Sequence, residues 1–169
     1  MIDEGQLENL LIFVSPQQKT KVLEILESKG VVHHQLTQEE GNAPRKEYSG
    51  LTERQYIIKL FKENKYQALV AIKCLDEGID IPSACRGILM ASSTNPREYV
   101  QRIGRIIRQD KDKKLAYLYD ICVESSSSLN EDLQDIDAKI RANECKRLQE
   151  ISENAINSID ALQNILKMN

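Results

Sequence analysis

Short apolar segments recur along the chain up to residue 121, and each is about as long as a strand. They lie at residues 10–14, 31–34, 68–72, 87–91 and 115–119. Most are continuous apolar runs rather than alternations of apolar and polar residues. Runs of this kind favour strands that are covered on both faces, as in a parallel sheet.

Helix signals separate these segments. Ser15 followed by Pro16 is typical of a helix start, with serine as the N-cap and proline at the first helical position. This helix should run to about Lys29 and stop at Gly30. Its inward-facing residues are predicted to be Val22, Leu23, Ile25 and Leu26.

A second helix is predicted over residues 53–64, with Thr52 as its cap. Asn95 and Pro96 repeat the cap-and-proline signal and open a third helix. Residues 37–50 contain two glycines, a proline and many charges, so they are predicted to form a mobile surface loop. The buried stripe of the second helix should consist of Tyr56, Ile57, Leu60 and Phe61.

Strands that alternate with helices in this way predict an α/β fold, a mainly parallel sheet sandwiched by helices. In such sheets ligands bind beyond the carboxyl ends of the strands. The segment after the 68–72 strand and the helix after the 87–91 strand both start at that edge. The edge is therefore where a functional site is expected.

The composition changes after residue 123. We place one domain at residues 1–123 and a helical extension at residues 124–169, which lacks glycine and proline. Apolar residues of the extension fall three and four apart, with an interruption between 140 and 148, which indicates one long helix or two. Two interpretations stay open: a helix packed on the domain, or a coiled-coil-like arm that binds a partner protein through residues 129–167.

Composition adds few constraints. Hydrophobic residues make up 41% and charged residues 29%, as in ordinary soluble globular proteins. No apolar run is long enough to cross a bilayer and no secretory signal precedes the first strand, so a cytoplasmic location is expected. The four cysteines form no Cys-x-x-Cys pair, which predicts reduced thiols and no metal site.

The formal net charge of −3 argues against strong autonomous binding of nucleic acid. The distribution of charge softens this argument, because residues 1–123 carry a net +1 and residues 124–169 a net −4. Within residues 97–114 there are seven lysines or arginines and three acidic residues. This stretch is a basic patch in an otherwise balanced domain.

Three arginines in this patch, Arg102, Arg105 and Arg108, follow one another at intervals of three residues. On a helix they project toward one broad side, where the guanidinium groups repel each other. The nearest acidic residues, Glu98 and Asp110, are too few to pair with all three. A bound polyphosphate explains the cluster, because planar guanidinium forks match phosphate oxygens. A solvated basic face is the alternative.

Two motifs in this part of the chain resemble those of a known family. Residues 101–108, QRIGRIIR, resemble motif VI of superfamily 2 helicases, and residues 76–82, DEGIDIP, resemble their motif V. The likeness extends over about Leu10 to Val123 and is to the bacterial DEAD/DEAH-box branch related to restriction-enzyme helicase subunits and XPB-type DNA helicases. It implies the second RecA-like domain of such an enzyme.

The resemblance also implies roles for the residues that contact ATP. Arg105 and Arg108 would be arginine fingers that stabilise charge on the transferring phosphoryl group. Arg102 would hold motif VI together and link it to the neighbouring domain, and Gln101 would support nucleotide or interdomain contacts.

In motif V, Asp80 would accept a hydrogen bond from the ribose hydroxyl of the nucleotide, and Gly78 would let the backbone come close. The alternative for Asp80 is a turn carboxylate before Ile81 and Pro82.

Residues on the nucleic-acid path also follow from the resemblance. It places Ser15, Thr37, Ile72 and Lys73 along this path. Many family members have a threonine where this chain has Ile72, so a hydroxyl that would bind the phosphate backbone is missing here.

The sequence contains only half of an ATPase site. No Walker A loop, G-x-x-x-x-G-K-[ST], is present, and the Lys19-Thr20 pair lies in the middle of a predicted helix. Leu75 to Gly78 resembles a Walker B motif only superficially. We therefore expect ATP and Mg²⁺ to be held mainly by a first RecA-like domain, upstream in the parent chain.

These observations favour the second motor domain of an ATP-dependent superfamily 2 helicase or translocase acting on DNA, catalytically silent by itself. The alternative is a non-catalytic interaction module that uses the C-terminal helix as a docking arm. A free-standing metabolite-binding domain is disfavoured, because the chain has no glycine-rich phosphate loop.

Overall fold

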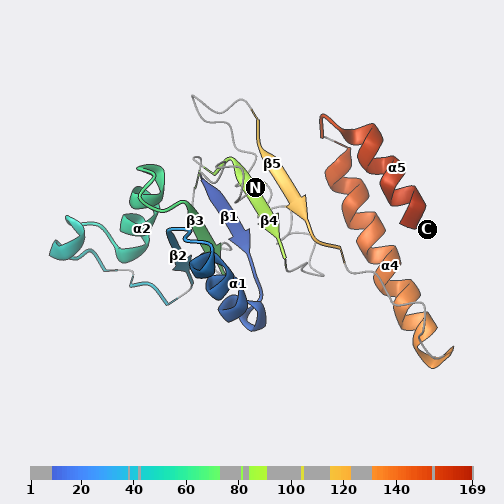
Figure 1. Ribbon diagram of the computed structural model, residues 1–169, viewed down its shortest axis with the longest axis horizontal. Coiled ribbons are helices and arrows are strands. Elements are labelled where there is room, and N and C mark those ends of the chain that lie inside the picture. Colours follow the sequence, from blue (N-terminus) through green and yellow to red (C-terminus); the bar gives the residue numbers. More distant parts are fainter. Residues whose placement is uncertain are drawn as a thin grey trace. The chain divides into compact units, whose positions relative to one another are not determined.

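The computed structural model describes residues 9–37, 39–41, 43–72, 81, 84–90, 104, 115–122, 131–153 and 155–168. The chain divides into two compact units, Met1–Ile121 and Cys122–Asn169. The first unit contains a sheet and its helices, and the second contains two helices (Figure 1).

Among the described residues, five strands form one sheet in the order β2-β3-β1-β4-β5, and all neighbouring strands are parallel. Their bounds are β1 Leu10–Phe13, β2 His33–Leu36, β3 Ala68–Ala71, β4 Arg86–Leu89 and β5 Tyr117–Asp120. The predicted α/β fold with a parallel sheet is confirmed. Each of the five strands lies within two residues of its predicted place.

The pairing register aligns the carboxyl ends of the strands. Ala71 of β3 lies opposite both Leu36 of β2 and Phe13 of β1. On the other side of β1, Phe13 lies opposite Leu89, which in turn lies opposite Asp120. All five strands thus end level, and the segments that follow them leave the sheet from a single edge.

Helix α1, Pro16–Ser28, covers one face of the sheet (Figure 1). Val22 and Leu26 join a core that includes alternate residues of β1 and β3. The prediction that Ile25 faces inward is wrong, since 48% of this residue is exposed. It lies about 80° around the helix from the midpoint of Val22 and Leu26. The core cluster comprises Leu10, Ile12, Val14, Val22, Leu26, Val31, Ala68, Val70 and Ile72.

The opposite face of the sheet is buried as well. Leu11, Leu69 and Leu36 are fully buried there, and Phe13 is 3% exposed. Burial on both faces explains why the strands are continuous apolar runs without alternation. Helix α2, Glu53–Lys62, lies against β2 and buries Ile57 and Phe61, while the predicted stripe residues Tyr56 and Leu60 are partly buried.

Helix α1 ends as its sequence predicts. Gly30 has φ +68°, the left-handed conformation that glycine adopts without strain. The N–H groups of Gly30 and Val31 donate to the carbonyls of Glu27 and Leu26, at 2.9 Å in both cases. The Val31 N–H therefore takes part in the hydrogen bonds that end α1, and β2 starts two residues later than predicted.

The described part of residues 37–50 contains structure that the prediction of a surface loop did not include. It contains a short 3-10 helix, η2, Lys46–Tyr48. The Arg45 N–H donates to the Leu51 carbonyl and the Gly50 N–H to the Arg45 carbonyl, each at 3.0 Å. The Tyr48 ring stacks on Tyr56 of α2 with 5.1 Å between centroids. The stretch after Thr37, residues 38–50, is called the insertion below, and its described part has structure of its own.

The second unit consists of α4, Glu131–Ser152, and α5, Ser158–Met168, which pack against each other. Of the two predicted alternatives, one long helix or two, the described residues show two, and α4 continues through the stretch between 140 and 148 where the apolar pattern is interrupted. Glu144 and Arg147 form an ion pair at 2.6 Å there, and both are buried. A buried charged pair breaks the apolar pattern without breaking the helix.

The predicted arginine helix lies outside the described residues except for Gly104, which is helical. Within the part of the chain that the structure describes, no helix is both long enough and apolar enough to span a membrane.

Thr52 provides a test of the local structure. Its side chain accepts a hydrogen bond from the Gln55 N–H at 3.2 Å, and Gln55 Oε1 accepts one from the Thr52 N–H at 3.0 Å. Thr52→Ala should lower the free energy of unfolding by about 1 kcal/mol. Thr52→Ser should retain most of the stability of the wild-type chain, because the hydroxyl that caps the helix remains. Urea unfolding followed by far-UV circular dichroism measures both, and equal losses would show that the cap is not stabilising.

Candidate nucleic-acid interface

Three of the predicted nucleic-acid residues follow three neighbouring strands. Thr37 comes after β2, Ile72 after β3 and Ser15 two residues after β1. The ladder continues one residue beyond the strands, since the Ile72 N–H donates to Leu36 at 3.0 Å and the Val14 N–H to Ala71 at 3.1 Å. Neighbouring strands are about 4.8 Å apart, so the three positions span roughly 10 Å of one edge.

Ile72 contributes to this edge through its main chain. Its residue exposure is 8%, and its side chain belongs to the core under α1. A side chain in this position stabilises the sheet rather than meeting a ligand.

Gln18, in the first turn of α1, holds Ser15 in place. Gln18 Oε1 accepts a hydrogen bond from the Ser15 N–H at 3.0 Å, and Gln18 Nε2 donates to the Met90 carbonyl at 3.1 Å. Met90 follows β4, and its own N–H donates to Phe13 at 2.9 Å. One amide side chain therefore ties the start of α1 to the ends of two strands.

Thr37 is the centre of a polar network at the end of β2. Its N–H and its hydroxyl both donate to Glu40 Oε1, at 2.6 and 2.8 Å. Its hydroxyl oxygen also accepts from the Glu39 N–H at 3.1 Å. The network joins the strand end to the start of the insertion.

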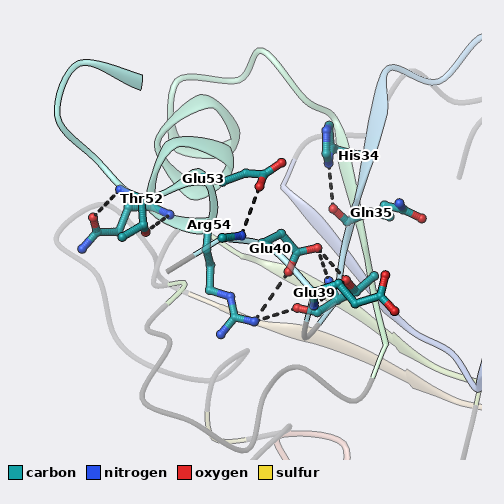
Figure 2. A network of polar contacts seen from close by, with 10 residues as sticks. His34, Gln35, Glu39, Glu40, Thr52, Glu53 and Arg54 are labelled. Atoms are coloured by element: carbon teal, nitrogen blue, oxygen red, sulfur yellow. Dashed lines mark hydrogen bonds and ion pairs between the residues drawn. The ribbon is translucent and has the colours of Figure 1, made fainter. Parts of the chain in front are cut away.

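Helix α2 supplies the cation of this network. Figure 2 shows Arg54 reaching from the first turn of α2 toward Glu40. Arg54 Nη2 donates to the Thr37 carbonyl at 2.7 Å and lies 3.5 Å from Glu40 Oε2. On the same turn, Glu53 Oε2 accepts from the Gly41 N–H at 3.1 Å. The insertion is thereby fastened to α2 at two points.

Neither Glu40 nor Arg54 was predicted from the sequence as a site residue. The spacing of Glu40, three residues after Thr37, is a signal that could have suggested a local side-chain contact. Arg54 gives no such signal, because it meets Thr37 only through the packing of α2 beside β2.

The residues assigned to the nucleotide lie outside the described part of the chain, as does Lys73. They are Gly78, Asp80, Gln101, Arg102, Arg105 and Arg108. Ile81, directly after Asp80, is fully buried, and its carbonyl accepts from the Ala84 N–H at 3.1 Å. Among the described residues, no cluster of three His, Cys, Asp or Glu side chains could hold a metal ion.

The model of the helicase conserved C-terminal domain matches residues 3–110, more than half of the chain. This chain belongs to that family. The matched range includes β1 to β4 and both motifs V and VI. Domains of this family are parts of ATP-dependent helicases and translocases of superfamily 2.

Curated relatives agree with this helicase domain assignment. The chain is 40% identical over 62 residues to the DNA 3'-5' translocase XPB2 of Sulfurisphaera tokodaii, covering 37% of this chain and 14% of that protein. It is 28% identical over 101 residues to putative helicase 22 of Sulfolobus islandicus filamentous virus, covering 60% and 16%. The chain thus spans about one seventh of the length of these relatives.

Solved structures show the same fold. The C-terminal part of the Fun30 ATPase domain matches with a TM-score of 0.59 at 19% identity, over 92% of this chain and 51% of that chain. Domain 2 of the DEAD-box helicase Mss116p, bound to an RNA duplex, matches with a TM-score of 0.51 at 16% identity, over 96% and 68%. The sheet of this helicase domain is therefore RecA-like, as expected.

Gln18 should be important for the stability of this edge. Gln18→Ala leaves the Ser15 N–H and the Met90 carbonyl without this partner, so the free energy of unfolding should fall by about 1–3 kcal/mol. Gln17→Ala is the matched control, because Gln17 is the exposed neighbour on the same turn. Thermal or urea unfolding compares the two variants. Equal stabilities would mean that the Gln18 contacts are not stabilising.

Proposed function

We propose that this chain is the second RecA-like motor domain of a superfamily 2 DNA translocase or helicase. The observation that carries the proposal is the family match over residues 3–110, which contains motifs V and VI in their expected order. Residues 1–123 form the motor domain in this proposal, and residues 124–169 a helical extension. DNA is favoured over RNA because the relative with 40% identity is a DNA translocase.

In this proposal a first RecA-like domain holds ATP and Mg²⁺, and this domain completes the site from across a cleft. Arg105 and Arg108 contact the nucleotide when the two domains close and stabilise the transferring phosphoryl group. Arg102 and Gln101 couple the nucleotide to the domain contact. Closure on ATP and opening after hydrolysis then move the pair along a strand.

Asp80 and Gly78 complete the nucleotide contact through motif V. Asp80 binds the ribose hydroxyl, and Gly78 lets the backbone approach. The alternative role of Asp80 is that of a turn carboxylate before the buried Ile81.

The nucleic-acid strand would run along the carboxyl edge. Thr37 offers a hydroxyl and an N–H there, and Ser15 offers a hydroxyl about two strand widths away. Ile72 contributes only main-chain atoms, and Lys73 adds a positive charge. Contacts of this kind go to phosphates, which position a strand without reading its sequence.

A second function, as an interaction module, is favoured by apolar side chains in the second unit. Ile156, two residues before α5, is 88% exposed, and Ile159 in the first turn of α5 is 72% exposed. A partner protein docking there would bury them. The two functions are separable, since only the motor requires the arginines of motif VI.

The arginine assignment is tested in the protein that contains both RecA-like domains. Arg105→Ala or Arg108→Ala should lower kcat on the order of 10³-fold or more, with a much smaller change in ATP affinity. Lysine should not restore the rate at either position, because a point charge lacks the bidentate fork. Stopped-flow hydrolysis measures this effect.

Thermal unfolding of the same variants separates the finger role from a structural one. Finger residues should leave Tm nearly unchanged, whereas structural residues would lower Tm together with the rate. Normal kcat in both alanine variants would instead support the solvated basic face and remove the finger assignment.

The 169-residue chain alone should hydrolyse no ATP, because it has no Walker A loop. It should bind single-stranded DNA weakly, with an affinity that falls steeply as salt increases, since phosphate contacts release counterions. Phosphate release and fluorescence anisotropy between about 50 and 200 mM salt measure these properties. Turnover by this chain, or tight binding that salt does not weaken, would contradict the proposal.

A further inference from the structure

We propose that Glu40 occupies a phosphate-binding site formed by Thr37 and Arg54, and that a nucleic-acid phosphate must displace it. The inference rests on the proposed function, in which Thr37 lies on the path of the strand. Glu40 would then be a built-in competitor that lowers the affinity of this domain for nucleic acid.

The donors around Glu40 are those that proteins use for phosphate. Oε1 of Glu40 accepts from the Thr37 N–H at 2.6 Å and from the Thr37 hydroxyl at 2.8 Å. The Arg54 guanidinium lies 3.5 Å from Oε2. A main-chain N–H, a hydroxyl and an arginine together recur at phosphate contacts on nucleic-acid backbones. The carboxylate thus takes the place that a phosphate oxygen would take.

The contact with the carboxylate leaves polar atoms poorly satisfied. The side chains of Glu40 and Arg54 are only 8% and 15% exposed. Oε2 of Glu40 and Nε of Arg54 are nevertheless buried without a hydrogen-bond partner. Burying polar atoms of charged side chains without hydrogen bonds lowers the stability of the folded state. A tetrahedral phosphate has more acceptor oxygens than a carboxylate and could meet both the threonine donors and the guanidinium fork.

The position of the site fits a strand contact. Thr37 directly follows β2 at the carboxyl edge, beside Ile72 and in line with Ser15. Arg54 reaches the same place from the first turn of α2 (Figure 2). Glu40 itself belongs to the insertion and not to a strand or helix. The donors are therefore fixed next to the end of β2 and in α2, and the competing anion belongs to the insertion.

Competition follows from the short tether between Glu40 and Thr37. A carboxylate only three residues from its donors has a high effective concentration, so an incoming phosphate must compete with it. Removing the charge or shortening the side chain should release the donors. If Glu40 makes only an ordinary loop contact, its loss should lower the affinity for nucleic acid, because Thr37 and Arg54 would be held less firmly.

The test compares Glu40→Gln with Glu39→Gln in the 169-residue chain. Both variants remove one negative charge, and Glu39 is an exposed neighbour that contacts Thr37 through its main-chain N–H. Relative to Glu39→Gln, Glu40→Gln should bind a 20-nucleotide oligo-dT about tenfold more tightly, the effect of one charge-assisted contact. Fluorescence anisotropy at fixed low salt measures the affinities.

Glu40→Asp is the second variant, because it keeps the net charge and shortens the side chain by one methylene. Its carboxylate should withdraw from Thr37, so its affinity should also exceed that of wild type. Thr37→Val in the Glu40→Gln background should abolish the gain, because it removes the hydroxyl donor. Far-UV circular dichroism confirms that each variant is folded.

Inorganic phosphate gives a readout that does not depend on nucleic acid. In NMR titrations the Thr37 amide should shift at lower phosphate concentration in Glu40→Gln than in Glu39→Gln. Equal titrations, or weaker oligo-dT binding by Glu40→Gln and Glu40→Asp, would overturn the inference. A phosphate response with no oligo-dT binding in any variant would support the anion site while contradicting the proposed nucleic-acid function.

Discussion

The parallel pairing of five strands, with both faces of the sheet buried, is the constraint on which the rest of the first unit depends. Parallel strands need a crossover between each pair, and the crossovers α1 and α2 bury the apolar runs. Because the strands end level, the polar residues that follow them meet at one edge. The sheet thus creates the place where a ligand can be bound, whatever the ligand is.

Polar contacts then fix the segments that leave this edge. Gln18 joins the start of α1 to Met90 after β4, and Arg54 joins the start of α2 to Thr37 after β2. Both side chains belong to the first turn of a helix and bind a main-chain carbonyl of a strand end. The crossovers are therefore held at the edge by hydrogen bonds as well as by the core below it.

The contact between Glu40 and Thr37 competes with the proposed contact between Thr37 and a phosphate. The Glu40 carboxylate satisfies the Thr37 N–H and hydroxyl and orders the insertion, yet in the proposed function the same donors face a phosphate. Glu40 Oε2 and Arg54 Nε are buried without a hydrogen-bond partner, which indicates that the contact is not optimised for stability. Local stability and access to the edge therefore depend on the same pair of donors.

The sequence by itself determined the order of the elements, their parallel sheet, the caps at Ser15 and Thr52 and the end of α1 at Gly30. These features depend on local signals, namely apolar runs, capping residues and a glycine with positive φ. Motifs V and VI also indicated the family, because their residues are contiguous. The roles assigned to Asp80, Arg105 and Arg108 remain predictions.

Only the tertiary structure decided which side chains meet. Ile25 is exposed because the sheet takes the stripe formed by Val22 and Leu26, and the charged side chains of Glu144 and Arg147 are buried as an ion pair within α4. Arg54 lies 17 residues from Thr37, and the contact exists only because α2 packs beside β2. Contacts of this kind depend on how elements pack in space, which the local pattern of residues does not specify.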